Sequence, residues 1–164
     1  MHPRPPSVFR PDLFEGRVAL VTGGGSGIGL AIARELGSLG CRVVLAARKL
    51  DRLVAAVDAL GEEGVEARAL ECNVRDEASV QAAVAGTIEA FGRLDFLVNN
   101  AGGQFPSPAE AIRTKGWNAV LETNLTGPFL MCREAHEAWM AENGGAIVNV
   151  IADMFRGFPG MAHT

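Results

Sequence analysis

Short apolar runs alternate with segments of helical periodicity along most of the chain. Runs rich in valine and leucine, the pattern of buried strands, lie at residues 17–22, 42–47, 65–72, 94–99 and 146–151. Between them, apolar residues recur at helical spacing and predict helices at residues 28–39, 50–60, 76–91 and 114–141. Strands that alternate with helices form repeated β–α–β units, so the pattern predicts an α/β fold with a parallel sheet.

The predicted architecture is a Rossmann-type, doubly wound parallel sheet of about five strands. The run at 65–72 alternates only weakly and is therefore expected near an edge of the sheet. No helix follows the run at 146–151, so the sheet is expected to be incomplete at its carboxy-terminal end. Residues 106–113 are expected to form a loop with a helical turn. We expect residues 1–14, with four prolines, to form an irregular arm and residues 15–164 to form one domain.

Composition and charge argue against several classes of protein. Apolar residues make up 48% of the sequence and charged residues 21%, which is the balance of a globular protein. The net charge of −4 offers no basic surface for nucleic acid, and no stretch approaches the roughly 20 apolar residues of a membrane span. The three cysteines have no metal-ligand spacing, so we expect no metal site, and their odd number predicts reduced thiols in a cytoplasmic protein.

A glycine-rich segment, TGGGSGIG at residues 22–29, lies between the first predicted strand and the first predicted helix. Glycine backbone turns tightly and lets a pyrophosphate approach closely, while the free N–H groups at the start of the helix face the anion. We therefore predict a phosphate-binding loop that comprises Thr22, Gly23, Gly25, Ser26, Gly27, Ile28 and Gly29. The alternative is a glycine-rich turn that only allows the helix and the strand to pack.

The end of the second predicted strand indicates which cofactor is bound. A carboxylate at this position would accept a hydrogen bond from the 2′-hydroxyl of NAD, but the strand ends with Ala46, Ala47, Arg48 and Lys49. The guanidinium group of Arg48 matches a 2′-phosphate, so Arg48 and Lys49 predict NADP(H) as the cofactor. Asp51 is better explained as a carboxylate in the first turn of the next helix. A solvated surface arginine is the alternative for Arg48.

Three spaced motifs resemble those of the short-chain dehydrogenase/reductase family. The phosphate motif TGxxxGxG matches residues 22–29, the motif NNAG matches residues 99–102, and a helix asparagine matches Asn124. The resemblance implies that the adenine is contacted by Asn73 and Val74, and the cofactor ribose by Asn100, Ala101 and Gly102. It also implies that Asn124 holds a water molecule in a proton relay. By spacing alone, Asn124 is equally suited to cap backbone groups at a helix irregularity.

A narrower resemblance concerns residues 99–110, 115–126 and 147–151. These segments look like the corresponding segments of peroxisomal-type trans-2-enoyl-CoA reductases, and the 2,4-dienoyl-CoA reductases are a similar but more distant match. The resemblance implies that NADPH reduces the 2,3 double bond of an acyl-CoA thioester. The expected small-molecule partner is therefore an acyl-CoA.

The sequence departs from the family pattern at two positions. The family's catalytic serine falls near Ala152, and alanine has no hydroxyl to donate to a substrate oxygen, which disfavours alcohol dehydrogenation. The family's Tyr-x-x-x-Lys pair falls beyond residue 164, and the sequence contains no tyrosine. We therefore expect the 164-residue chain alone to be inactive. The alternatives are a 2,4-dienoyl-CoA or 3-oxoacyl reductase, or a non-catalytic nucleotide-binding module.

Several loop residues are candidates for substrate contacts. An acyl pocket at the carboxyl ends of the strands could be lined by Phe105, Met154, Phe155, Phe158 and Met161, which are equally suited to pack on the core. Arg156 is a candidate contact for CoA phosphates, with a solvated loop arginine as the alternative. A longer protein containing this chain is expected to be a homo-oligomer, and to be peroxisomal if a carboxy-terminal signal follows residue 164.

Overall fold

A computed structural model of the chain describes residues 7–152 and 160–163. Its five strands are β1 (Val18–Thr22), β2 (Arg42–Ala47), β3 (Ala67–Glu71), β4 (Phe96–Asn99) and β5 (Ala146–Asn149). They form one parallel sheet in the order β3-β2-β1-β4-β5, which confirms the α/β Rossmann-type prediction. The predicted substrate contacts at positions 154, 155, 156 and 158 lie outside the described residues.

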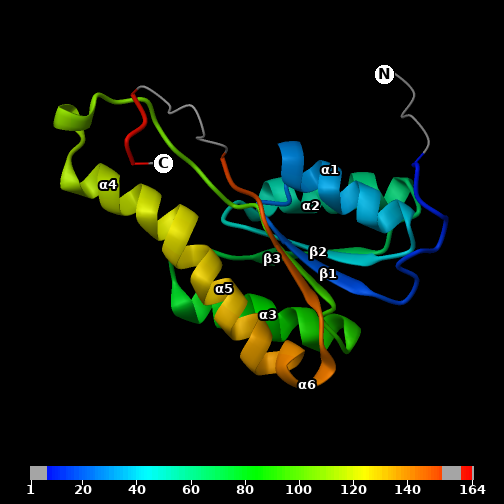
Figure 1. The fold of residues 1–164 in the computed structure, drawn as a ribbon. Helices are drawn as coiled ribbons and strands as arrows, with labels where there is room; N and C mark the ends of the chain where they lie inside the picture. The colour runs from blue at the N-terminus through cyan, green and yellow to red at the C-terminus, as the bar shows by residue number, and fades with distance from the viewer. Residues whose placement is uncertain (1–6, 153–159, 164) are drawn as a thin grey trace.

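Helices cover both faces of the sheet (Figure 1). They are α1 (Gly27–Ser38), α2 (Leu50–Glu62), α3 (Glu77–Phe91) and a long helix made of α4 (Thr114–Leu121), η2 (Glu122–Thr126), α5 (Gly127–Ala135), η3 (His136–Met140) and α6 (Ala141–Asn143). The helices α1 and α2 lie on one face, and α3 and α5 lie on the other. The short 3-10 helix η1 (Ala109–Ala111) supplies the predicted turn between β4 and α4.

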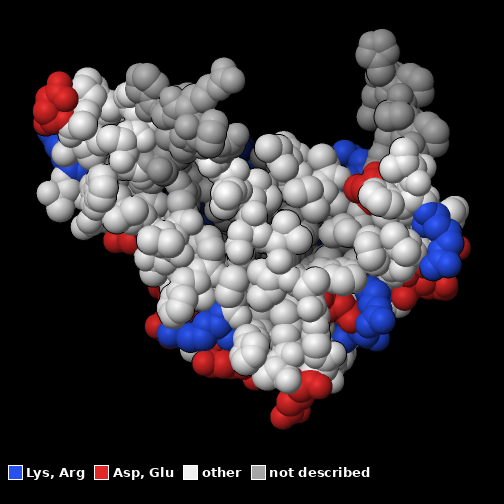
Figure 2. Space-filling model, in the orientation of Figure 1, with Lys and Arg blue, Asp and Glu red and all other residues white. Residues whose placement is uncertain are grey.

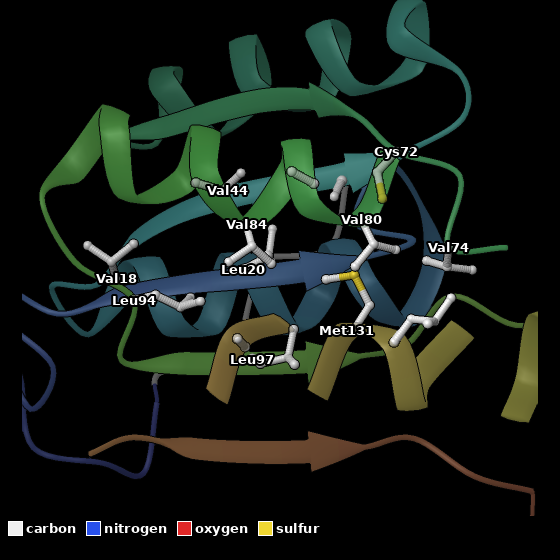
Figure 3. Packing of buried hydrophobic residues seen from close by; sticks show 14 of the residues in the cluster. Val18, Leu20, Val44, Cys72, Val74, Val80, Val84, Leu94, Leu97 and Met131 are labelled. Carbon is white, nitrogen blue, oxygen red and sulfur yellow. The ribbon is translucent and has the colours of Figure 1, made fainter. Parts of the chain in front are cut away.

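Strand β1 lies at the centre of the sheet, and all five of its residues are buried. Because side chains alternate along a strand, β1 contributes to two apolar clusters. Val18 and Leu20 face α3 and α5, where Val80 and Met131 meet them (Figure 3). Ala19 and Val21 belong to the cluster on the other face, with side chains of α1 and α2. This double burial explains why the strand sequence is a continuous apolar run.

The observed boundaries of the helices and strands lie within two residues of the predicted ones. Strand β3 is indeed at an edge, as its weak alternation predicted, but it is shorter than the predicted run. The helix predicted at 114–141 extends to Asn143 and contains two π-helical segments, η2 and η3. The apolar pattern predicted neither segment, and the capping alternative for Asn124 was the one indication of an irregularity, at η2.

The outer edge of the sheet at β5 is apolar and accessible. Ile147, Val148, Val150 and Ile151 are all exposed, and the surface over β5 carries few charged groups in Figure 2, where basic and acidic side chains are interspersed towards the periphery. In the part of the chain that the structure describes, no strand pairs with this edge. No helix among the described residues is long and apolar enough to cross a membrane.

Asp95 joins the amino-terminal ends of the three strands β1, β4 and β5. Its carboxylate accepts hydrogen bonds from Arg17 Nη1 (2.8 Å), the Val18 amide (2.9 Å) and Arg93 Nε (2.7 Å), while its carbonyl oxygen accepts one from the Ala146 amide (2.9 Å). Burial by itself raises the pKa of the Asp95 carboxyl, but the hydrogen bonds from Arg93, Arg17 and Val18 outweigh it, so that pKa lies below its ordinary value. The ionised carboxylate therefore stabilises the fold.

We predict that Asp95→Asn lowers the free energy of unfolding at pH 7 by about 1.5–3 kcal/mol, since hydrogen bonds to a charged group are lost. Because the folded-state pKa is depressed, this contribution is present above the unfolded-state pKa of about 3.9 and is lost as the pH falls below it. Urea unfolding at pH 7, 5 and 3 measures the difference, with exposed Asp58→Asn as the control. A difference that persists unchanged at pH 3 contradicts the prediction.

Candidate functional site

A cleft opens at the carboxyl ends of the strands, beside the junction of β1 and β4. These strands are neighbours in the sheet, but the chain leaves β1 towards one face and β4 towards the other, so their ends form the switch point at which such sheets bind ligands. The cleft has a volume of about 510 Å³, within the range of small-molecule sites. It is lined by Gly23, Gly25, Ser26, Ala46, Ala47, Arg48, Lys49, Arg52, Cys72, Asn73, Val74, Arg75, Asn100, Ala101, Gly102 and Thr123.

Thr22 lies behind the cleft and connects the turn after β1 to the turn after β4. Its hydroxyl oxygen accepts hydrogen bonds from the amides of Asn100 and Ala101, both at 3.0 Å, and its hydroxyl donates to the Val98 carbonyl at 3.3 Å. The Asn100 side-chain amide donates in return to the Thr22 carbonyl (2.9 Å) and the Gly23 carbonyl (3.3 Å). The turn after β4 is thereby fixed to the turn after β1.

The glycine loop allows α1 to begin directly against this junction. A side chain at Gly29 would place its Cβ 2.5 Å from the Gly23 carbonyl oxygen and against the Asn100 side-chain amide, so only glycine fits there. A Cβ at Gly27, by contrast, would meet no atom within 4 Å, although its φ of +56° favours glycine. Ser26 precedes the helix, and its side chain makes no capping hydrogen bond. The first amides of α1 and the Ser26 hydroxyl are therefore available to an anion.

The rim of the cleft at the start of α2 is basic. Arg48, Lys49 and Arg52 line it, and no carboxylate is among its lining residues. Within residues 7–152 and 160–163, none of these three side chains has an ion-pair partner. Asp51 lies in the first turn of α2, as predicted, and does not line the cleft. Arg75 is also a lining residue, but its guanidinium is paired with Glu122.

The turn between β3 and α3 forms a further wall of the cleft, which is lined by Asn73, Val74 and Arg75. Asn73 Oδ1 accepts a hydrogen bond from the Arg75 amide at 3.3 Å, and its own amide donates to Ser79 Oγ at 2.9 Å, which fix the shape of the turn. Val74 packs against Gly127 so closely that a Cβ there would lie 2.9 Å from Val74 Cγ2. Cys72 also lines the cleft, and burial raises the pKa of its thiol, so the thiol stays protonated at neutral pH.

Asn124 lies in the π-helical segment η2, the helix irregularity anticipated from the sequence. Its Oδ1 accepts from the Gly103 amide and its Nδ2 donates to the Gly103 carbonyl, both at 3.0 Å. Both ends of the side-chain amide therefore bind the segment that follows Gly102. This geometry fits the backbone-capping alternative, and the role in a proton relay stays a prediction.

Ten of the predicted cofactor residues line the cleft, from both sides of the β1–β4 junction. The other four, Thr22, Gly27, Ile28 and Gly29, do not line it, and neither does Asn124, the residue predicted for the proton relay. Thr22 and Gly29 are buried behind the loop and shape it, whereas Ile28 is exposed. Six lining residues were not among the predicted site residues, namely Ala46, Ala47 and Cys72 and the polar residues Arg52, Arg75 and Thr123. Their proximity to Arg48, Val74 and Asn124 in the sequence was the available signal.

A second hollow of about 410 Å³ lies beside α4. Its lining residues are Phe105, Ala111, Arg113, Lys115, Gly116 and Ala119. The ring of Phe105 also stacks on His163, with centroids 4.5 Å apart, and Met161 forms an isolated parallel bridge with Ser107. The structure thus brings together Phe105 and the segment containing Met161, two of the predicted pocket residues. Their role in acyl binding stays a prediction.

The sheet order, the glycine loop at the switch point and the cleft define a Rossmann-type α/β protein with a candidate ligand site at the carboxyl ends of its strands. Residues 17–162 match the family model for short chain dehydrogenase, and the chain belongs to this family of oxidoreductases. The family prediction made from the three motifs is thereby confirmed.

Similar proteins have different stated activities. A peroxisomal 2,4-dienoyl-CoA reductase of Danio rerio is 36% identical over 156 residues, which cover 94% of this chain and 51% of that protein. A solved citronellol catabolism dehydrogenase of Pseudomonas aeruginosa PAO1 is 46% identical with a TM-score of 0.91, and the match covers 96% of this chain and 64% of that one. An actinorhodin polyketide ketoreductase solved with NADPH is 43% identical with a TM-score of 0.81, covering 83% and 53%. The chain spans about half the length of the curated relatives it matches.

We predict that Thr22→Val destabilises the protein and loosens the turn after β4. The amides of Asn100 and Ala101 would lose their acceptor, at a cost of about 1–3 kcal/mol for each unpaired donor. Urea unfolding measures the loss, and hydrogen exchange of these two amides is expected to accelerate. Thr22→Ser keeps the hydroxyl and is the matched control. Equal stability of the valine and serine variants would refute this role for the hydroxyl.

Proposed function

We propose that the cleft binds NADPH. The rim that carries Arg48 has three cations and no carboxylate, which suits a 2′-phosphate and offers no acceptor to a free 2′-hydroxyl. The first amides of α1 have no helical partner, and the Ser26 side chain makes no capping hydrogen bond. These uncharged donors are therefore available to bind a pyrophosphate. The ketoreductase relative solved with NADPH supports this choice of cofactor.

We further propose that the protein reduces a carbon–carbon double bond conjugated to an acyl-CoA thioester. The observation that carries this proposal is Ala152, three residues after β5. The Val150 amide donates to the Asn99 carbonyl at 2.9 Å. The chain therefore leaves β5 at the carboxyl ends of the strands, where Asn100 and Gly102 also lie. An alanine there has no hydroxyl to polarise a ketone or alcohol oxygen, whereas hydride addition to a β-carbon does not require a donor at that carbon.

The relatives favour a 2,4-dienoyl-CoA over the simple trans-2-enoyl-CoA that the sequence motifs favour. Both substrates share the conjugated thioester, and both become enolate-like when hydride is added. The ketoacyl and polyketide reductases are similar in sequence as well, but the alanine at 152 speaks against their chemistry. The names of the dienoyl-CoA reductases also support a peroxisomal location, and the cytoplasmic location stays a prediction.

The bound cofactor would supply the hydride, and the chain's own residues would orient it. Asn100, Ala101 and Gly102 form one wall of the cleft, held by Thr22 on one side and, through Gly103, by Asn124 on the other. Protonation of the enolate-like product requires an acid. Among the described residues, the Thr123 hydroxyl on the lining of the cleft donates to the Ala119 carbonyl at 2.8 Å, and Asn124, which does not line the cleft, is bonded to Gly103. We therefore expect binding by this chain without turnover.

The proposed cofactor makes a direct prediction about Arg48. We expect the protein to bind NADPH more tightly than NADH, and Arg48→Ala to weaken NADPH binding by about ten- to a hundredfold, since a charge-assisted contact of roughly 1.5–3 kcal/mol is lost. Fluorescence titration of both cofactors measures the change. NADH affinity is expected to stay within about twofold of the wild type. Equal affinities of the wild type for the two cofactors would exclude the proposed specificity.

The proposed reaction is tested by the change in NADPH absorbance with four substrates. A trans-2-enoyl-CoA, a 2,4-dienoyl-CoA and a 3-ketoacyl-CoA are each supplied with NADPH and assayed by loss of absorbance, whereas a simple secondary alcohol is supplied with NADP and assayed by gain of absorbance. We expect the 164-residue chain to show negligible turnover, and any longer product of its reading frame to consume NADPH with the first two substrates. General acid catalysis typically contributes 10²–10⁴-fold in rate, which is the deficit expected of the shorter chain. Preference for the ketoacyl substrate would overturn the proposal, and no turnover by a longer product would favour a non-catalytic module.

A further inference from the structure

Arg52 lies where the phosphate loop meets the basic rim. It is in the first turn of α2, three residues after the N-cap Lys49, so the two side chains lie on the same side of the helix. A Cβ at Gly25 would lie 3.3 Å from Leu53 Cδ2 and 3.7 Å from Arg52 Cβ, which shows how closely the loop packs against this turn. Arg52 is exposed, lines the cleft and, among the described residues, has no hydrogen-bond or ion-pair partner.

The charges around the cleft leave few groups to neutralise the phosphates of a dinucleotide. The glycine loop at residues 22–29 contains no charged side chain. Of the four cations that line the cleft, Arg75 is already paired with Glu122. Arg48, Lys49 and Arg52 are therefore the unpaired cations on the lining of the cleft, and all three belong to the five-residue stretch that follows β2.

One arginine does not match the full charge and all three oxygens of a 2′-phosphate. A phosphate monoester carries about −1.5 to −2 charges near pH 7 and has three acceptor oxygens, whereas a guanidinium carries one charge and binds two oxygens in its bidentate geometry. Arg48 alone would leave one oxygen and part of the charge unmatched. We infer that Arg52 is a second guanidinium for the 2′-phosphate, so that Arg48 and Arg52 together determine the preference for NADPH. This inference rests on the cofactor proposed above.

The position of Arg52 favours the 2′-phosphate over the pyrophosphate. The first turn of α1 and Ser26 offer neutral donors to the pyrophosphate. Arg52 instead belongs to the helix that directly follows β2, the strand whose end selects between the two riboses. The two possible ligands make different predictions, because NADH contains the pyrophosphate and lacks the 2′-phosphate.

The experiment compares the purified wild-type chain with Arg52→Gln, Arg48→Gln and the double variant. Titrations use NADPH, NADH, adenosine 2′,5′-bisphosphate and 5′-AMP. The charge-matched control is Arg68→Gln, at the amino-terminal part of β3, where its guanidinium lies 5.9 Å from the centre of the Phe91 ring. We expect Arg52→Gln to weaken NADPH and the bisphosphate by about tenfold or more, and to leave NADH, 5′-AMP and the control unaffected.

Three results would overturn the inference. Equal losses for NADPH and NADH would place Arg52 on the pyrophosphate. Unchanged NADPH binding in Arg52→Gln, with a wild type that prefers NADPH, would leave the proposed cofactor intact and make Arg52 a solvated arginine. A wild type without preference would refute the cofactor itself. Arg52→Lys keeps the charge without the planar fork, and we expect it to bind NADPH with intermediate affinity.

Discussion

The Thr22 hydroxyl joins the carboxyl ends of β1 and β4, and the geometry of the cleft depends on this junction. The two strands lie side by side although β2, β3 and three helices separate them in the sequence. Beyond their last ladder bonds, the backbone amides of Asn100 and Ala101 would be left unpaired without the hydroxyl that accepts both. Unpaired buried donors are costly, so the same contact that satisfies the backbone also holds the phosphate loop against the turn after β4.

The long helix that begins at Thr114 fixes the cleft from the other side. Its π-helical segment places Asn124 against Gly103, while Glu122 at the start of that segment pairs with Arg75. One turn further, Gly127 lets the helix contact Val74. A single irregular helix therefore positions both the segment after β4 and the turn after β3. A regular helix would rotate these groups by about 100° for each residue of register, and π-helical segments are frequent at functional sites for this reason.

The uncharged and the charged hydrogen-bond donors of the cleft come from two different elements of the fold. The loop before α1 is neutral and offers backbone amides, whereas the start of α2 offers exposed cationic side chains. Backbone donors are fixed by the fold and suit a group that every dinucleotide has in common. Long cationic side chains are free to move and can be exchanged without disturbing the core, so they are suited to distinguish one ribose from another.

Four features could be predicted from the sequence: the parallel α/β architecture, the edge position of β3, the glycine loop before the first helix and the basic residues that follow β2. These features are local, since apolar periodicity, glycine spacing and the residue that follows a strand depend on neighbours in the chain. The folded structure was needed to show that Thr22 binds backbone amides, that both ends of the Asn124 amide bind Gly103, and that Arg52 and Arg75 line the same cleft. Each of these outcomes depends on which distant donor meets which acceptor, and that is set by the order of strands in the sheet and by the register of the long helix.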